Sequence, residues 1–342
     1  MINYLKNQLK NLPMMILICI TFYGIVALAD SYAIDSNQVG FNNTGTGIQS
    51  TNAQAAINEV FLHATDYNSM DTRVTALEGL IVEDAGNHNS IYRGKDVTSY
   101  LTASGDDNLF TRISSGKFTD LYVGDYFTKD ITIGGNTTTV TWRIAGFDMY
   151  YGKGDSCGDG TACKVHHAVI VPDTNLTSAQ MNASNTTGVT DWTLGAYAGS
   201  KMYNETLPTI ETAIKNAFGS SHILKYRATL TNSINASATN RYPGTTGASS
   251  GWAWYDAYVN LMNTVQVTGN IGFSSSAFDT GVDNIQFPLF RLKPEFVNKQ
   301  KSWYWLRDVS TSAYFANIHL NGYSSGNGAS ASGGVRPCFY ID

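Results

Sequence analysis

The most suggestive catalytic motif in this sequence is Gly322-Tyr323-Ser324-Ser325-Gly326, which matches the GxSxG pattern around the nucleophile of many serine hydrolases. That pattern requires a strand–turn–helix at the serine, with an acid and then a histidine later in the chain. After Ser324 the sequence contains one acid, Asp342, and no histidine. We therefore attribute the match to local Gly/Ser composition, and we predict no catalytic residue and no enzymatic activity.

Histidines and carboxylates give only weak candidates for a metal site. His166 and His167 are adjacent, and adjacent side chains of a strand point to opposite faces, so we expect one packed or hydrogen-bonded histidine rather than a shared ion. Calcium needs several oxygen ligands, and Asp155, Asp159 and Asp173 follow no EF-hand or tandem pattern. Phosphate-binding and dinucleotide-binding glycine motifs are also missing. We predict no metal and no other cofactor.

The cysteines indicate an oxidising compartment. Cys157 and Cys163 flank a Gly/Asp-rich loop that could close as a small hairpin disulfide. Two free thiols, or a zinc or redox pair, are the alternatives, although CxxC spacing is absent. Cys338 lies in an apolar terminal segment, so we expect it to be a buried small hydrophobic residue.

Charge is scarce in this chain of 342 residues, of which only 14% are charged, compared with about 25% in an average globular protein. The 43% hydrophobic and 12% aromatic contents are sufficient for a core and argue against extensive disorder. A net charge of −5 without a basic region argues against nucleic-acid binding. Tyr, Asn, Ser and Gly replace the missing charge, and these residues are typical of adaptable binding loops.

The first 29 residues have the features of a signal peptide. Lys6 and Lys10 precede an apolar run over residues 14–29, and Ala27-Leu28-Ala29 offers small residues for cleavage. The run is shorter than the roughly 20 residues that a membrane-spanning helix needs. The alternatives are an uncleaved membrane anchor and a buried helix. We therefore expect a secreted or cell-surface protein.

A flexible linker over residues 30–51 and a coiled-coil stalk over residues 52–86 are expected next. The stalk has apolar residues at steps of three and four, as a heptad seam does. The seam consists of Ile57, Val60, Ala64, Tyr67, Met70, Val74, Leu77 and Ile81. A coiled coil requires partner chains, so we predict a homotrimer. The alternative is a helical hairpin packed on the following domain.

Residues 87–342 are expected to form one loop-rich α+β head. Amphipathic spacing predicts helices over residues 205–218 and 254–265. Neutral loops are expected over residues 235–251 and 321–334. The strands expected in the first half of the head cover residues 118–126, 131–133, 140–147 and 166–171.

The C-terminal part contains aromatic and basic residues that suit a core. Trp303 and Trp305 alternate with Tyr304, so one face of a strand there would bury two indoles. Arg307 and Arg336 are expected to pair inside the head with a carboxylate such as Asp308, or with carbonyl groups.

Several segments resemble the phage tail-fibre and bacterial surface proteins whose heads are related to C-type lectins and to the formylglycine-generating enzyme. The C-terminal ones are Ser302-Trp303-Tyr304-Trp305-Leu306-Arg307, Ala313-Tyr314-Phe315-Ala316, Asn321-Gly322 and Gly334-Val335-Arg336-Pro337. Upstream, the likeness includes Gly94-Lys95-Asp96-Val97-Thr98, Val123-Gly124-Asp125-Tyr126 and Gly219-Ser220-Ser221-His222. Residues 47–57 also resemble a shaft-entry repeat, so the likeness covers roughly residues 35–342.

The resemblance implies a C-type-lectin-like head whose terminal strands frame exposed loops that bind a host surface. The ligand contacts it suggests are Tyr314, Asn317, His319, Asn321, Tyr323 and Asn327. The related oxidase holds copper with a pair of cysteines. Residues 301–310, the corresponding stretch, contain none, which argues against that activity here.

Together these observations predict a non-enzymatic receptor-binding or adhesion protein that attaches to a cell-surface glycan or protein. A location on a virion tail is the alternative to secretion or cell-surface display. Two other functions stay open: a metal-dependent oxidoreductase or glycan-modifying enzyme on the same fold, and a structural surface or virion decoration protein.

Overall fold

A computed structural model of the chain describes residues 55–59, 85–153, 163–183, 195–235, 237, 248–272 and 284–342. The chain divides into two compact units, Met1–Ile81 and Val82–Asp342. In the first unit, residues 55–59 are helical; the expected signal peptide, the linker and most of the stalk lie outside the described residues. Among the helices that are described, none has the length and apolar character needed to cross a membrane.

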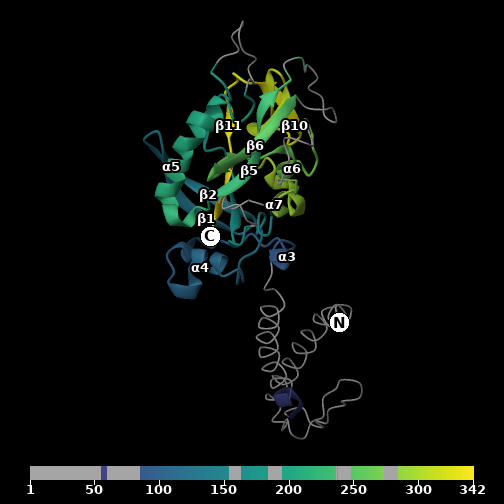
Figure 1. The fold of residues 1–342 in the computed structure, drawn as a ribbon. Helices are drawn as coiled ribbons and strands as arrows, with labels where there is room; N and C mark the ends of the chain where they lie inside the picture. Colours follow the sequence, from purple (N-terminus) through teal and green to yellow (C-terminus); the bar gives the residue numbers. More distant parts are fainter. Residues whose placement is uncertain are drawn as a thin grey trace. The chain divides into compact units, whose positions relative to one another are not determined.

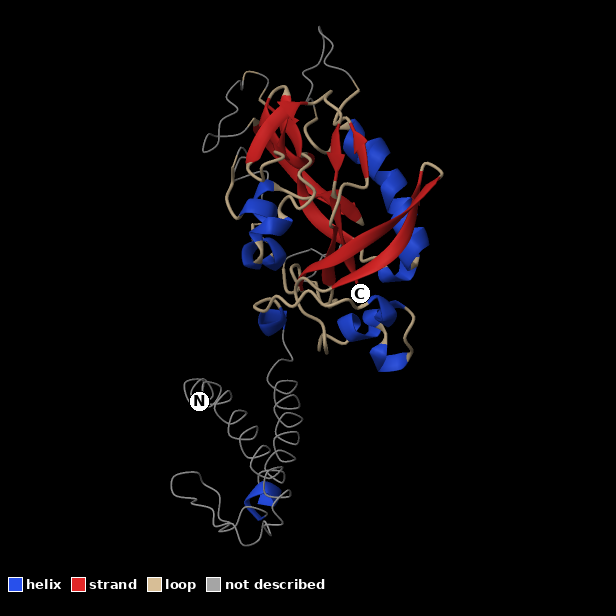
Figure 2. Cartoon of the chain, turned by 180° about the vertical axis from the view of Figure 1, so that it is seen from behind, coloured by secondary structure: helices blue, strands red, loops and turns tan. Residues whose placement is uncertain are grey.

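The second unit is a mixed α+β structure that consists mostly of strands (Figures 1 and 2). Its larger sheet has the strand order β1-β2-β3-β12-β7, and every neighbouring pair is antiparallel. These strands are β1 (Tyr126–Ile133), β2 (Asn136–Phe147), β3 (Ala168–Pro172), β12 (Pro337–Ile341) and β7 (Val259–Leu261).

Sequence explains both the turn and the centre of this sheet. Gly134 and Gly135 join β1 to β2 with φ angles of 58° and 83°, the left-handed conformation that a two-residue hairpin turn requires. In the middle, β3 and β12 are buried at every residue. Their sequences are continuous apolar runs rather than alternating ones, as expected for strands covered on both faces.

A second five-stranded sheet has the order β10-β9-β8-β11-β4. Its strands are β10 (Ser324–Gly328), β9 (Tyr314–Ile318), β8 (Tyr304–Thr311), β11 (Gly333–Val335) and β4 (Thr177–Ala179). A side chain at Gly333 would collide with the indoles of Trp303 and Trp305. Gly333 therefore permits close packing of the two indoles, one of which, Trp305, is fully buried.

The remaining strands, β5 (Tyr226–Ile234) and β6 (Ser249–Ala257), pair only with each other in an antiparallel two-stranded sheet. The inner face of this sheet, which includes Tyr226, Ala228 and Leu230, lies in the hydrophobic core. A hairpin is rarely stable by itself, so the stability of this one depends on that burial.

Few helices accompany the sheets, and most are short. α5 (Leu207–Phe218) follows a π-helical turn, Met202–Thr206, and ends at Gly219, whose φ is 90°. α6 (Thr264–Thr268) begins with a capping box between Asn263 and Gln266. The others are α3 (Ala85–His88), α4 (Leu109–Ser114), α7 (Pro288–Leu292) and the 3-10 turns Thr98–Leu101, Gly105–Asp107, Ser220–His222 and Pro294–Phe296.

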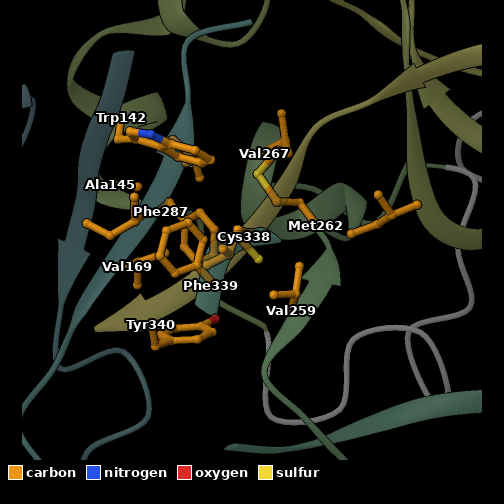
Figure 3. Close-up of a cluster of buried hydrophobic side chains, with 14 of the residues drawn as sticks. Trp142, Ala145, Val169, Val259, Met262, Val267, Phe287, Cys338, Phe339 and Tyr340 are labelled. Carbon is orange, nitrogen blue, oxygen red and sulfur yellow. The ribbon is translucent and has the colours of Figure 1, made fainter. Parts of the chain in front are cut away.

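Aromatic side chains of the larger sheet lie in the hydrophobic core, where Figure 3 shows Trp142, Phe339 and Tyr340 in one cluster with Phe287. Trp142 from β2 meets Phe339 from β12 edge to face at 5.4 Å, and Phe218 from α5 lies 5.6 Å from Trp142. Cys338 is buried in the same cluster, as the sequence predicts. The exposed parts of the head are therefore carried by a rigid aromatic interior.

Buried arginines join the strands to the surrounding loops. Arg336 donates to the carbonyl oxygens of Pro172, Phe296 and Val297, which confirms the expectation that it pairs with carbonyls. Arg143 forms two hydrogen bonds with Asp173, at 2.7 and 2.8 Å. Arg143 is therefore held by a carboxylate inside the head, and Arg336 by carbonyl oxygens.

Three sequence predictions about the head are wrong. Residues 118–125 are irregular, with turns and one isolated bridge between Val123 and Tyr92, because Phe118 and Asp120 adopt positive φ angles; the strand starts at Tyr126. The helix expected over residues 254–265 is replaced by β6, β7 and only then α6. The loop expected over residues 321–334 contains β10 and most of β11. In addition, α3 spans the boundary expected at residue 86.

Candidate binding surfaces

The turn between β9 and β10, residues 319–323, forms an exposed hairpin tip. Its backbone is closed by hydrogen bonds from His319 N to Tyr323 O and from Gly322 N to His319 O, both 2.8 Å. The side chain of Asn298 donates to the same His319 carbonyl, also at 2.8 Å. The Tyr323 ring stacks on the His319 ring, with centroids 4.5 Å apart. An exposed aromatic ring is thus held in one position.

The structure brings together three of the six residues suggested as ligand contacts. His319, Asn321 and Tyr323 share the hairpin tip, where Tyr323 is 53% exposed. Asn317 is buried on β9, so its side chain is not displayed. Tyr314 and Asn327 are half-buried near the opposite end of the hairpin, where Tyr314 pairs with Gly328. Four residues of strand separate the two ends, roughly 14 Å.

A second exposed aromatic surface lies on the two-stranded sheet. Along β6 the exposed residues alternate with less exposed ones, so Ser250, Trp252, Trp254 and Asp256 share one side, which we call the indole face. Trp252 and Trp254 are 42% and 40% exposed. Their rings meet edge to face, with centroids 5.9 Å apart and an interplanar angle of 86°. The two indoles therefore form a corner.

Ion pairs occupy one end of the indole face. Asp256 accepts from Arg227 Nε at 2.6 Å and from Lys225 Nζ at 2.7 Å. Hydrogen bonds from Arg227, which has the larger effect, and from Lys225 lower the pKa of Asp256 to about 2. This carboxylate consequently stays ionised near neutral pH, with its two cations beside the indoles.

Sequence reasoning missed the indole face because Tyr255, Tyr258, Val259 and Met262 also fit a helical spacing. The signal that could have identified it is the alternation of Trp252, Trp254 and Asp256 with Ala253, Tyr255 and Ala257. Helical and strand periods overlap over such short segments.

The histidine pair has structural contacts. His167 is fully buried, and burial lowers its pKa, so the ring is neutral; it accepts from Tyr150 N and donates to the Val165 carbonyl. His166 hydrogen-bonds Asp148 and stacks on Tyr151 at 4.4 Å. Both rings are packed and hydrogen-bonded, whereas the sequence predicted this of one histidine.

The other candidates for chemistry have ordinary structural surroundings where they are described. Burial alone would raise the pKa of Asp173, but hydrogen bonds from Arg143 and Lys299 outweigh it and lower that pKa. Asp155 and Asp159 lie outside the described residues. Within the described ranges, no group of three or more His, Cys, Asp or Glu side chains is placed to hold a metal ion.

Cys163 is buried and disulfide-bonded. Cys157 lies outside the described residues, so the Cys157–Cys163 pairing stays a prediction. The GxSxG motif spans the hairpin tip and the start of β10, an antiparallel edge strand. Ser324 is therefore not at the strand–turn–helix elbow that this motif requires.

Comparison with known proteins identifies no relative of this chain. No protein-family model matches the chain, and neither the curated proteins nor the solved structures contain a significant match to it. Two surfaces of the head, the hairpin tip and the indole face, are therefore the candidates for a function.

Proposed function

We propose that this chain is a non-enzymatic attachment protein whose head binds a cell-surface glycan or protein through the hairpin tip. The observation that carries the proposal is the 53% exposed ring of Tyr323, held against His319 on a closed turn. Tyrosine supplies a large contact area at a small entropic cost. A side chain that is already fixed loses little further freedom on binding.

The surroundings of the tip also suit recognition. Residues 309–335 contain no Asp, Glu, Lys or Arg, so a ligand would meet neutral polar groups and aromatic rings. Leu320, which is 43% exposed, and the exposed Asn321 lie beside Tyr323. Charged residues are depleted at the centres of protein interfaces, whereas tyrosine is enriched there.

The proposal extends to the rest of the chain on sequence grounds. Residues 1–29 would direct export or anchor the protein, and residues 52–86 would assemble three chains, so that three heads act together. Three linked tips raise the avidity for a multivalent surface without any new contact. The C-type-lectin-like identity of the head belongs to the same proposal, and its support is the sequence resemblance.

The test compares two tyrosines that each stack on a histidine. The labelled full-length chain is incubated with a panel of bacterial cells, and attachment is measured by flow cytometry. Tyr323→Ala is expected to lower attachment about tenfold or more, as the loss of a central aromatic contact does. The matched control is Tyr151→Ala, which removes a 38% exposed ring from His166 and is expected to leave attachment unchanged.

Denaturant unfolding of both variants establishes that their heads are folded. The proposal fails if the folded wild-type chain binds no cell in the panel. It also fails if Tyr323→Ala and Tyr151→Ala bind as well as the wild type.

A further inference from the structure

The indole face has a composition that stability alone does not explain. Trp252 and Trp254 lie opposite Thr231 and Thr229 in the register of β5 and β6. Both threonines are buried, and the Thr229 hydroxyl has no hydrogen-bond partner. A buried hydroxyl without a partner costs free energy, and two exposed tryptophans leave apolar area in water. Together, these costs favour a role in binding.

The size of the exposed aromatic area indicates a small ligand. Two tryptophan side chains that are each about two-fifths exposed present on the order of 200 Å² together. A stable protein–protein interface buries about 800 Å² on each partner. The corner between the two indoles thus has the area of a single ring-sized group rather than that of a protein interface.

The groups around the corner specify the chemistry of that ligand. Asp256, Arg227 and Ser250 provide hydrogen-bond acceptors and donors beside the indoles. Asp256 is paired with both Arg227 and Lys225, so one net positive charge remains, on side chains that are partly exposed to water. A ligand that matches such a site has an apolar face bordered by neutral hydroxyl groups.

We propose that the indole face is a carbohydrate-binding site that stacks one neutral pyranose ring of a glycan against Trp252 and Trp254. The C–H groups on one face of a pyranose are apolar and pack on an indole, whereas its hydroxyl groups point outward toward the polar rim. A nucleobase would also stack on indoles, but a nucleic acid would require a cationic surface for its phosphates. Here the two nearby cations are already paired with Asp256.

This inference deepens the proposed attachment function by naming a ligand class and a second site, and it rests on that function only for its biological context. The two sites lie on different sheets, β5–β6 and β9–β10. Each can therefore be removed separately.

The experiment applies the full-length chain to an array of neutral hexose and N-acetylhexosamine oligosaccharides. Binding to the retained oligosaccharides is then titrated through tryptophan fluorescence. The wild type is expected to bind, with a change in indole emission. Trp252→Ala and Trp254→Ala are expected to weaken binding about tenfold or more, and the Phe variants to retain part of it. Tyr151→Ala, which removes an exposed aromatic ring outside both surfaces, is the control that leaves oligosaccharide binding unchanged.

The two proposals fail in different ways in this design. Absence of binding to every neutral oligosaccharide by the folded wild type overturns the carbohydrate site, as does wild-type binding by Trp252→Ala and Trp254→Ala. Loss of cell attachment in Tyr323→Ala with unchanged tryptophan variants supports the hairpin tip alone. Cell attachment that survives periodate cleavage of surface sugars and still needs both tryptophans indicates a protein ligand, and this also overturns the carbohydrate site.

Discussion

The two hairpins of the head expose aromatic residues in opposite ways. In the β9–β10 hairpin, β9 is almost entirely buried, β10 is half-buried, and the exposed residues lie at the tip. In the β5–β6 hairpin, one face of β6 is itself exposed and carries Trp252 and Trp254. The first hairpin belongs to a five-stranded sheet, whereas the second pairs with no other strand. A ligand would therefore meet a turn on one hairpin and a strand surface on the other.

The largest expected difference concerns stability. Phe315→Ala, on β9, removes a fully buried ring and is expected to lower the free energy of unfolding by about 3–5 kcal/mol. Trp252→Ala, on β6, removes a ring that is 42% exposed and is expected to cost roughly 1–2 kcal/mol. Denaturant unfolding of both variants measures the difference. Equal losses would show that the indole face is as integral to the core as β9.

Sequence predicted the fold class and several elements of the head for identifiable physical reasons. The α5 helix was located to within two residues at its start and correctly at its end, because Leu207, Ile210, Ile214 and Phe218 repeat with helical period and Gly219 stops the helix. The burial of Trp305 and Cys338 also followed from local patterns.

Other features depend on pairing that no local pattern reveals. Neutral composition suggested a loop at residues 321–334, but Ser324–Gly328 is an edge strand because β9 is available to pair with it. The hairpin tip was anticipated as a display site, yet Asn317 turns inward, since the register with β8 and β10 decides its face. The Trp252–Trp254 corner needed the strand assignment that the sequence did not provide.

Asn317 tests the boundary between the buried strand and the exposed tip. Its side chain is 4% exposed, and its Oδ1 has no hydrogen-bond partner. Asn317→Ala is expected to change the free energy of unfolding by no more than about 1 kcal/mol, because lost packing is offset by removing a buried oxygen without a partner. Attachment to the cells that Tyr323 recognises should persist. If a stable Asn317→Ala variant lost attachment, Asn317 would be a ligand contact after all.

The smallest expected effect is a pH dependence of the unfolding free energy that arises in the β5–β6 hairpin, from Asp256. The folded-state pKa of Asp256, about 2, is below the usual value of about 3.9 for an unfolded chain. The ionised carboxylate therefore adds stability that is complete above about pH 4 and is lost as the pH falls toward 2. Its ion pairs are partly exposed, so we expect no more than about 0.5 kcal/mol.

The measurement is the difference in unfolding free energy between the wild type and Asp256→Asn from pH 7 down to pH 2. That difference should be constant above pH 4 and disappear near pH 2. The difference between the wild type and Phe315→Ala should show no such step, because this substitution removes no ionisable group. A constant Asp256→Asn difference down to pH 2 would mean that the contacts with Arg227 and Lys225 do not stabilise the indole face. Its polar rim would then be free to rearrange around a ligand.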